Sequence, residues 1–236
     1  MSSTDVRDRL AIALDVPDLE QAAALAKEVS PFVGVAKIGL ELYSAAGPEA
    51  IACLKALDFS VFADLKFHDI PTTVRRAARV IGTQGVAYLN MHAAGGLDMI
   101  KAGVDGLLDG AHAAGHPAPT PIAVTVLTSD PDTSAFATRL ACAIDGGCGG
   151  VVCSVHEVER VHAARADYVT IVPGIRFDDA SRHDQARIGT PEDAARVRAD
   201  VLVLGRTITE SPDPRAAAER AHASFANALT NALRGH

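Results

Sequence analysis

The sequence predicts an α/β fold in which residues 1–236 form a single domain, a (β/α)8 or TIM barrel. Eight short apolar runs of strand length alternate with segments whose apolar residues recur at helical spacing. Strands that are apolar on both faces and separated by helices form parallel sheets, and eight such units favour closure into a barrel. The length of 236 residues is also close to the roughly 250 residues typical of this fold.

The first half of the chain is predicted to contain four strands, each followed by a helix. The strands are expected at 10–14, 33–38, 60–65 and 86–91, and the helices at 18–30, 47–57, 74–81 and 97–111. The third helix shows its pattern most plainly, because apolar residues recur at i, i+3, i+4 and i+7 from Val74 to Ile81. The turn after the first strand, residues 14–17, has no glycine, which argues against the alternative of an open doubly wound sheet.

The second half repeats the same alternation. The strands are expected at 122–127, 151–153, 168–172 and 201–204, and the helices at 134–144, at 156–164, from near Pro191, and over 217–232. The glycine-rich run 146–150 precedes the sixth strand, so we interpret it as a turn at the bottom face of the barrel. The longest connection without periodicity is 173–190, and loops of this length in a compact domain are usually functional.

The composition excludes several classes of function. A formal net charge of −7 makes general binding to nucleic acid unfavourable, because phosphate attraction needs a basic face. The N-terminus lacks the apolar region of a signal peptide, and no apolar run reaches the length of a membrane span. The four cysteines show neither C-x-x-C nor zinc-site spacing, so we expect free thiols, no bound metal and a cytoplasmic location.

Polar residues gather where the predicted strands end. The active site of a (β/α)8 barrel lies at the carboxyl ends of its strands, so these residues are the candidates for chemistry. In strand order they are Asp15, Lys37, Asp64 with Lys66, Asn90 with His92, Thr128 with Ser129, Arg176, and Arg206.

The third strand carries the densest charge. Asp64 and Lys66 are two residues apart, so they point to the same side of a strand, and Asp69 follows just beyond it. A structural ion pair is the alternative explanation. Buried ion pairs stabilise a fold poorly because of desolvation, so a cluster of them at a strand end favours a catalytic role.

The segment D-L-K-F-H-D-I-P-T-T at 64–73 resembles the signature of the orotidine 5′-phosphate decarboxylase family. The resemblance covers almost the whole chain, in the family's order and at strand ends. It includes A-L-D at 13–15, K-I-G-L at 37–40, V-T-V-L-T-S at 124–129, V-P-G-I-R at 172–176, Gln185, and G-R-T-I-T at 205–209. One departure is Thr207, where the family more often carries proline.

The resemblance implies the reaction. Orotidine 5′-phosphate would lose carbon dioxide from C6 and give uridine 5′-phosphate in pyrimidine nucleotide biosynthesis, without a metal or another cofactor. Lys66 would donate the proton to C6 and Asp64 would face the substrate carboxylate. Lys37 and Asp69 would complete an alternating network of charges around Lys66.

The resemblance also implies the binding residues and the assembly. The residues matching Asp69 and Thr73 reach the neighbouring protomer's site, so a homodimer with shared active sites is expected, without a membrane or nucleic-acid partner. The other matching residues would contact the rest of the substrate. Those for the ribose hydroxyls are Asp15 and Lys37, those for the pyrimidine are Ile70, Pro71 and Thr128, those for the phosphate are Gly205 and Arg206, and those on the closing loop are Arg176 and Gln185.

Two other functions remain open on sequence grounds. The first is a magnesium-dependent sugar-phosphate decarboxylase or synthase of the same suprafamily, which shares the D-x-K-x-x-D core. Lys37, in place of a carboxylate, and D-I-P, in place of D-A-G, argue against it. The second is a non-catalytic phosphate-binding barrel, and the presence of both Asp64 and Lys66 argues against that. The roles of His68 and His92 are left unassigned.

Overall fold

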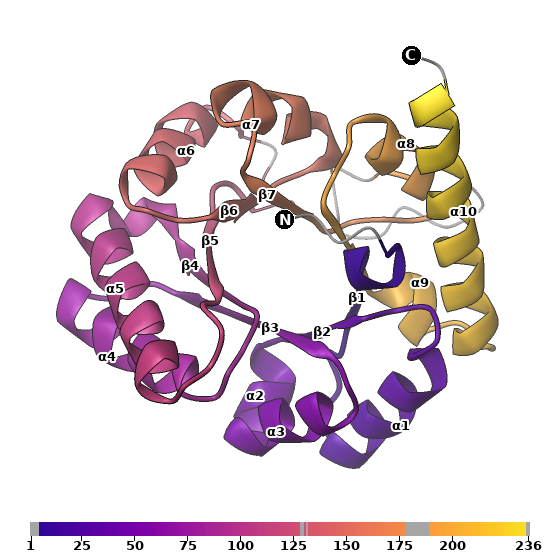
Figure 1. The fold of residues 1–236 in the computed structure, drawn as a ribbon, viewed down its shortest axis with the longest axis horizontal. Coiled ribbons are helices and arrows are strands. Elements are labelled where there is room, and N and C mark those ends of the chain that lie inside the picture. The colour runs from indigo at the N-terminus through magenta and orange to yellow at the C-terminus, as the bar shows by residue number, and fades with distance from the viewer. Residues whose placement is uncertain (1–4, 128–129, 131, 178–188, 235–236) are drawn as a thin grey trace.

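Eight parallel strands close into a barrel in the computed structural model, which describes residues 5–127, 130, 132–177 and 189–234 (Figure 1). Each strand pairs with the next in the sequence, and β8 returns to pair with β1. The predicted (β/α)8 barrel is therefore confirmed. The strands are β1 (Leu10–Ala13), β2 (Val35–Ile38), β3 (Ser60–Phe67), β4 (Tyr88–His92), β5 (Thr120–Val124), β6 (Gly150–Val152), β7 (Val169–Val172) and β8 (Val201–Leu204).

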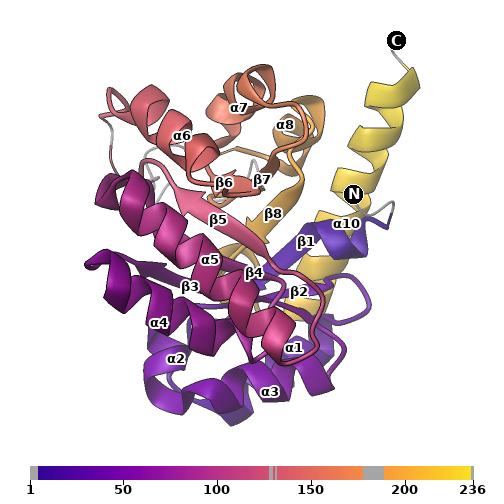
Figure 2. The same ribbon diagram turned by 60° about the vertical axis from the view of Figure 1, so that its left-hand side comes forward.

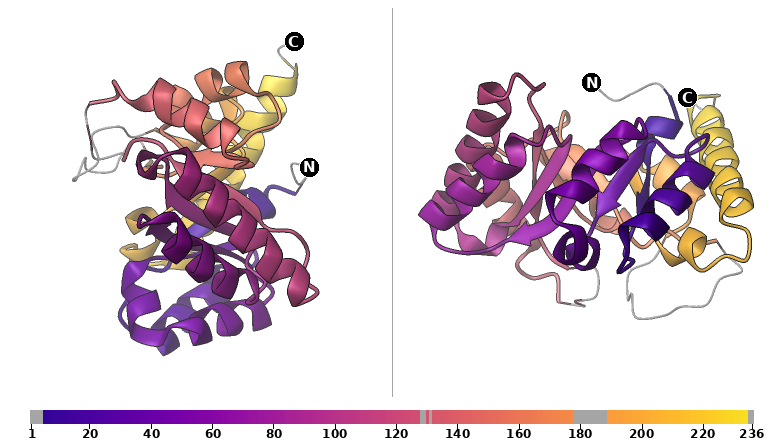
Figure 3. Two further views of the ribbon diagram at one scale, coloured as in Figure 1. Left: turned by 90° about the vertical axis from the view of Figure 1, so that its left-hand side faces the viewer. Right: turned by 90° about the horizontal axis from the view of Figure 1, so that it is seen from below.

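Helices surround the barrel on its outer side (Figures 2 and 3). They are α1 (Leu19–Val29), α2 (Leu40–Ala46), α3 (Pro48–Ala56), α4 (Pro71–Gly82), α5 (Leu97–Ala113), α6 (Phe136–Asp145), α7 (Val158–Ala164), α8 (Pro191–Arg196), α9 (Arg206–Thr209) and α10 (Pro214–Arg234). Short 3-10 turns η1 (Arg7–Arg9), η2 (Ala93–Gly95) and η3 (Val155–Glu157) complete the description. No helix in these ranges is long and apolar enough to cross a bilayer.

The structure corrects the predicted elements in three places. Helices α2 and α9 were not predicted, because seven and four residues are too few to show a helical period. The fifth strand ends at Val124 and not at residue 127, since its pairing with β4 and with β6 stops there. In contrast to these three places, the glycine-rich run 146–150 forms a turn as predicted, with Gly147 at a φ of 83° between α6 and β6.

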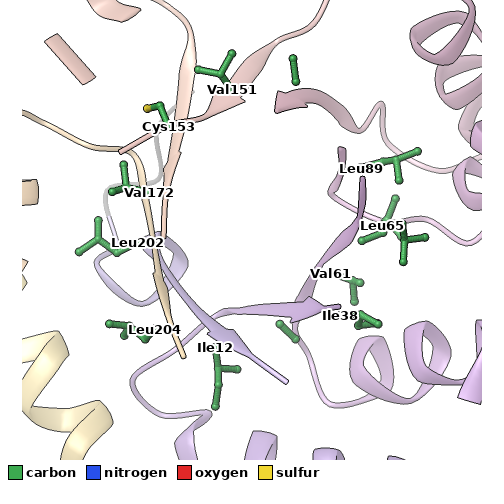
Figure 4. Packing of buried hydrophobic residues seen from close by; sticks show 14 of the residues in the cluster. Ile12, Ile38, Val61, Leu65, Leu89, Val151, Cys153, Val172, Leu202 and Leu204 are labelled. Atoms are coloured by element: carbon green, nitrogen blue, oxygen red, sulfur yellow. The ribbon is translucent and has the colours of Figure 1, made fainter. Parts of the chain in front are cut away.

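The barrel wall separates two apolar layers. Side chains on the outer side of the strands, among them Ile12, Leu89 and Leu202, point away from the barrel axis toward the helices (Figure 4). Alternate residues point inward and form a second cluster that includes Val35 and Phe62. Two residues further along their strands, the inward positions carry polar groups, so the barrel interior changes from apolar to charged toward the carboxyl ends.

The strand β3 is irregular near its end. Ala63 pairs with Leu89 and Phe67 pairs with Met91, so four steps along β3 lie opposite two steps along β4. Within this bulge Lys66 has a φ of 50°, in the left-handed region that side chains other than glycine rarely adopt. Bulges of this kind are common next to active sites, where they redirect a side chain.

The helices behind β3 and β4 are packed tightly. Helices α4 and α5 lie side by side (Figure 2). Their backbones come close together where α5 carries glycine. A Cβ atom at Gly106 would lie 2.2 Å from the Arg75 carbonyl oxygen, and one at Gly110 would lie 2.1 Å from that of Arg79. These glycines allow the close contact that supports the two strands.

Candidate active site

A cavity of about 750 Å³ opens at the carboxyl ends of the strands. Its wall is built from the ends of β1, β2, β3 and β5 to β8 and from the loops that follow them. Seven of the residues predicted from sequence line it: Asp15, Lys37, Asp64, Lys66, Arg176, Gly205 and Arg206. The structure therefore brings these seven residues together at the carboxyl ends of the strands.

Four charged side chains of alternating sign form a row along one wall of the cavity. The Nζ atom of Lys37 lies 2.9 Å from Asp15 Oδ1 and 3.3 Å from Asp64 Oδ2. The Nζ atom of Lys66 lies 2.6 Å from the other oxygen of Asp64, Oδ1. The Lys66 side chain is 34% exposed and that of Lys37 only 9%, so Lys66 presents its ammonium group to the cavity.

Asp64 is the centre of this row. Burial raises the pKa of its carboxyl group. The opposing effect is larger: the pKa is lowered by the positive charges of Lys37 and Lys66 and by the hydrogen bonds from Lys66 and Asn90. The net effect is a pKa below the ordinary value, so Asp64 is ionised at neutral pH. A buried carboxylate is thus kept charged beside the cavity.

Asn90 is a member of the site to which the sequence analysis assigned no role. It is fully buried on β4, its side-chain amide donates to Asp64 Oδ1 at 2.6 Å, and its side-chain carbonyl accepts from the Lys66 backbone N–H at 2.7 Å. The available signal was a polar residue within an otherwise apolar core strand. Its partners could not be identified without the register between β3 and β4.

The loops after β7 and β8 form the part of the site across the barrel from β3. Arg176 is largely buried, and its Nη1 donates to the Thr207 hydroxyl at 3.0 Å. That hydroxyl donates in turn to the Ile175 carbonyl at 2.9 Å. Arg206, the first residue of α9, lines the same cavity, so two arginines stand at this side of it, and a guanidinium group suits the binding of a planar or phosphate anion.

Four predicted site residues do not line the cavity of this chain. Asp69, Ile70, Pro71 and Thr73 are all exposed around the start of α4, and Ile70 retains 66% of its surface. The carboxylate of Asp69 accepts a hydrogen bond at 2.6 Å from the Ile70 N–H. Two further predicted residues, Thr128 and Gln185, lie outside the described residues.

Two histidines, His68 just after β3 and His92 at the end of β4, lie against each other. The rings of His68 and His92 have centroids 5.6 Å apart, with their planes tilted by 40°. The pKa of His92 is lowered, first by burial and then by His68, Lys66 and Arg139. His92 is therefore neutral at pH 7, although it lies close to the ammonium group of Lys66.

Comparisons with known proteins agree on one family. Residues 8–221 match the model described as the "Orotidine 5'-phosphate decarboxylase / HUMPS family". Proteins named orotidine 5′-phosphate decarboxylase are similar: that of Anaeromyxobacter sp. (strain K) is 44% identical over 89% of this chain and 95% of its own. That of Moorella thermoacetica is 43% identical over 90% of each. The crystal structure of the Lactobacillus acidophilus enzyme superposes with a TM-score of 0.76 at 33% identity, covering 92% of this chain and 99% of that one.

Proposed function

Because the chain belongs to the orotidine 5′-phosphate decarboxylase / HUMPS family, we propose that it converts orotidine 5′-phosphate to uridine 5′-phosphate. This carboxy-lyase reaction belongs to pyrimidine nucleotide biosynthesis. The observation that carries the proposal is the row of alternating charges Asp15, Lys37, Asp64 and Lys66 on the cavity wall. A volume of about 750 Å³ also lies in the range of about 300 to 1,000 Å³ that small-molecule sites occupy.

In the proposed reaction the bond between C6 and the substrate carboxylate breaks, and carbon dioxide leaves. The electron pair stays on C6, and Lys66 Nζ transfers a proton to that carbon. Lys66 then regains a proton from water, which closes the cycle. An ammonium group fixed 2.6 Å from Asp64 supplies both the proton and a positive charge where the negative charge develops.

Asp64 has a separate role in this scheme. Its ionised carboxylate faces the carboxylate of the substrate, so the repulsion between them falls as carbon dioxide leaves. The low pKa of Asp64 supports this role, because a neutral acid would exert no such repulsion. Lys37, held between Asp15 and Asp64, keeps the row charged and with Asp15 contacts the ribose hydroxyls.

The rest of the nucleotide provides binding energy for the reacting centre. The proposed phosphate site consists of Arg206 and the backbone N–H of Gly205, with Arg176 and Gln185 from the preceding loop. Thr128 contacts the edge of the pyrimidine. The cavity-lining positions of Gly205, Arg206 and Arg176 support this assignment, as does the general placement of phosphate at the loops after strands seven and eight of such barrels.

The proposal includes a homodimer with shared active sites. Asp69 and Thr73 would contribute to the site of the second copy, and Ile70 and Pro71 would close the pyrimidine pocket at that junction. Their exposure at the start of α4, outside the cavity of their own chain, supports this reading.

A magnesium-dependent activity of the same suprafamily is less well supported. Its metal would need carboxylates that are free to coordinate it near the ends of β2 and β3. Here the ammonium group of Lys37 lies between Asp15 and Asp64 and satisfies both with contacts of 2.9 and 3.3 Å. A cation supplied by the chain itself therefore occupies the place where these two carboxylates would hold a metal.

The test is to mix the purified protein with orotidine 5′-phosphate in EDTA and follow the ultraviolet absorbance as uridine 5′-phosphate forms. Rapid conversion is the expected result. Activity on a sugar phosphate only after addition of magnesium would assign the chain to the metal-dependent relatives. Inactivity under both conditions would favour the remaining alternative, a non-catalytic phosphate-binding barrel.

A further inference from the structure

Asn90 connects the two residues that the proposed reaction depends on most. Its side chain lies inside the barrel on β4, fully buried, and does not line the cavity. Its Oδ1 accepts the Lys66 N–H and its Nδ2 donates to Asp64 Oδ1. The two contacts fix the orientation of the amide, because a flipped amide would direct a donor at the Lys66 N–H and an oxygen at a carboxylate.

The first contact holds the bulge of β3. Lys66 has a φ of 50°, and its N–H is directed at a side chain of β4 where a regular ladder would offer a carbonyl. An apolar residue at position 90 would leave this N–H buried without an acceptor, which is costly. Asn90 therefore maintains the backbone conformation that sets the direction of the Lys66 side chain.

The second contact holds the carboxylate. Asp64 Oδ1 receives Lys66 Nζ and Asn90 Nδ2, both at 2.6 Å, while Oδ2 lies 3.3 Å from Lys37. The donors on both oxygens fix the rotation of the carboxylate about its terminal bond. Without Asn90, the Oδ1 side would be held by the flexible Lys66 side chain.

We propose that Asn90 is a positioning residue for the decarboxylation, which aligns the Lys66 ammonium and the Asp64 carboxylate through one buried amide. The inference rests on the proposed function. Because Asn90 does not reach the cavity, it acts on the chemical step and leaves substrate binding nearly unchanged. A variant at Asn90 should therefore lower kcat and leave KM nearly unchanged, whereas loss of a contact with the substrate would raise KM.

The first variant is Asn90→Ala, with Thr170→Val as matched control. Thr170 is also fully buried in the barrel wall and also makes two side-chain hydrogen bonds, both to Asp200, which is not a member of the charged row. We expect Asn90→Ala to lower kcat by about tenfold to a hundredfold with KM within about threefold, while the control loses thermal stability but keeps its kcat. An unchanged kcat in Asn90→Ala, or an equal loss in the control, would overturn the proposal.

The isosteric variant Asn90→Asp adds a readout that a purely structural role would not change. The introduced carboxyl group can still accept the Lys66 N–H, but its contact with Asp64 depends on protonation. The charged and titratable groups around it are Lys37 on β2, Asp64 and Lys66 on β3, and His92 on β4. When protonated it donates to Asp64 as the amide does, and when ionised it repels Asp64.

The kcat of Asn90→Asp should therefore be closest to that of the wild type at low pH and fall as pH rises. A pH profile parallel to that of the wild type would contradict the positioning role. Hydrogen exchange of the Lys66 amide separates this inference from the proposed function. Exchange that is at least about tenfold faster in Asn90→Ala supports the contact even if the wild type fails to convert orotidine 5′-phosphate, and unchanged exchange would refute it.

Discussion

The Thr207 hydroxyl joins two loops of the barrel by accepting from Arg176 Nη1 at 3.0 Å and donating to the Ile175 carbonyl at 2.9 Å. Thr207 is the second residue of α9 and adjoins Arg206, so the loop after β7 is tied to the helix that carries the proposed phosphate contact. Proline, which the sequence resemblance leads us to expect here, has no hydroxyl and could make neither bond. The departure from the family pattern therefore has a structural role in this chain.

Substitution Thr207→Val should weaken substrate binding. Loss of the hydroxyl removes one of the bonds that hold the Arg176 guanidinium, so we expect KM for orotidine 5′-phosphate to rise about threefold to tenfold with a small change in kcat. Steady-state kinetics would measure this, with Ser211→Ala as control, because the Ser211 hydroxyl bonds to Asp213 and not to Arg176 or Ile175 in the described residues. A KM equal to that of the wild type would show that Thr207 does not position Arg176.

Substitution Lys66→Ala should abolish turnover and leave the fold intact. Removing the proposed proton donor and its charge is expected to lower kcat by at least about a thousandfold. Circular dichroism would check the fold, and Lys101→Ala on the exposed face of α5 is the control. Activity near that of the wild type would remove Lys66 from its proposed role.

The barrel and the charged row were predictable because both depend on local patterns. Apolar runs and helical periods give the strands and helices, and the carboxyl ends of parallel strands meet at one edge, which brings Asp15, Lys37, Asp64 and Lys66 together. The regular alternation that predicted the meeting of Asp64 and Lys66 was only partly right. The two side chains meet within a bulge where Lys66 has a positive φ, and nothing in the sequence around Lys66 indicates it.

Other features of the site depend on contacts that one segment cannot reveal. The role of Asn90 requires the register of β4 against β3, and that of Thr207 requires the approach of two loops 31 residues apart. Asp69 and Thr73 were placed in the site from family resemblance, and in a single chain both remain at the surface. The role that we propose for them requires a second copy of the chain.

Substitution Arg206→Ala should act mainly on binding. Losing the guanidinium that we propose to contact the phosphate should raise KM by at least about tenfold and lower kcat/KM by more, because binding energy from the phosphate also serves the transition state. Kinetics with orotidine 5′-phosphate and with orotidine should be compared, since the nucleoside has no phosphate to lose. Arg79→Ala on the exposed side of α4 is the control, and equal kinetic constants for Arg206→Ala and the wild type would show that the phosphate site is misplaced.

Shared active sites predict complementation between inactive chains. Lys66→Ala and Asp69→Asn should each be nearly inactive alone, yet a mixture that has exchanged subunits should recover about a quarter of the wild-type activity. In a mixed dimer, one site keeps Lys66 from one chain and Asp69 from the other, and half of the dimers are mixed. If the mixture stays inactive while ultracentrifugation shows mixed dimers, Asp69 does not act across the interface.

The pH dependence of stability should report on His92. Burial, followed by His68, Lys66 and Arg139, lowers its pKa in the folded protein below the ordinary value of 6.5, so the unfolded chain binds the proton more readily. The free energy of unfolding must then decrease as pH falls below about 6.5, and the loss is complete once pH is below the folded pKa. At pH 7.5 both states are neutral at this position and His92 contributes no pH dependence.

Substitution His92→Asn removes this titration. Urea unfolding at pH 7.5 and pH 5.5 should show a smaller loss of stability for His92→Asn than for the wild type, while His112→Asn, on the exposed end of α5, should follow the wild type. For each protein, the free energy of unfolding at pH 5.5 is subtracted from that at pH 7.5. A change in packing caused by the substitution affects both values equally and therefore cancels. If His92→Asn loses as much stability as the wild type over this interval, then His92 does not take up a proton on unfolding. The conclusion that His92 is neutral in the folded protein would then be wrong.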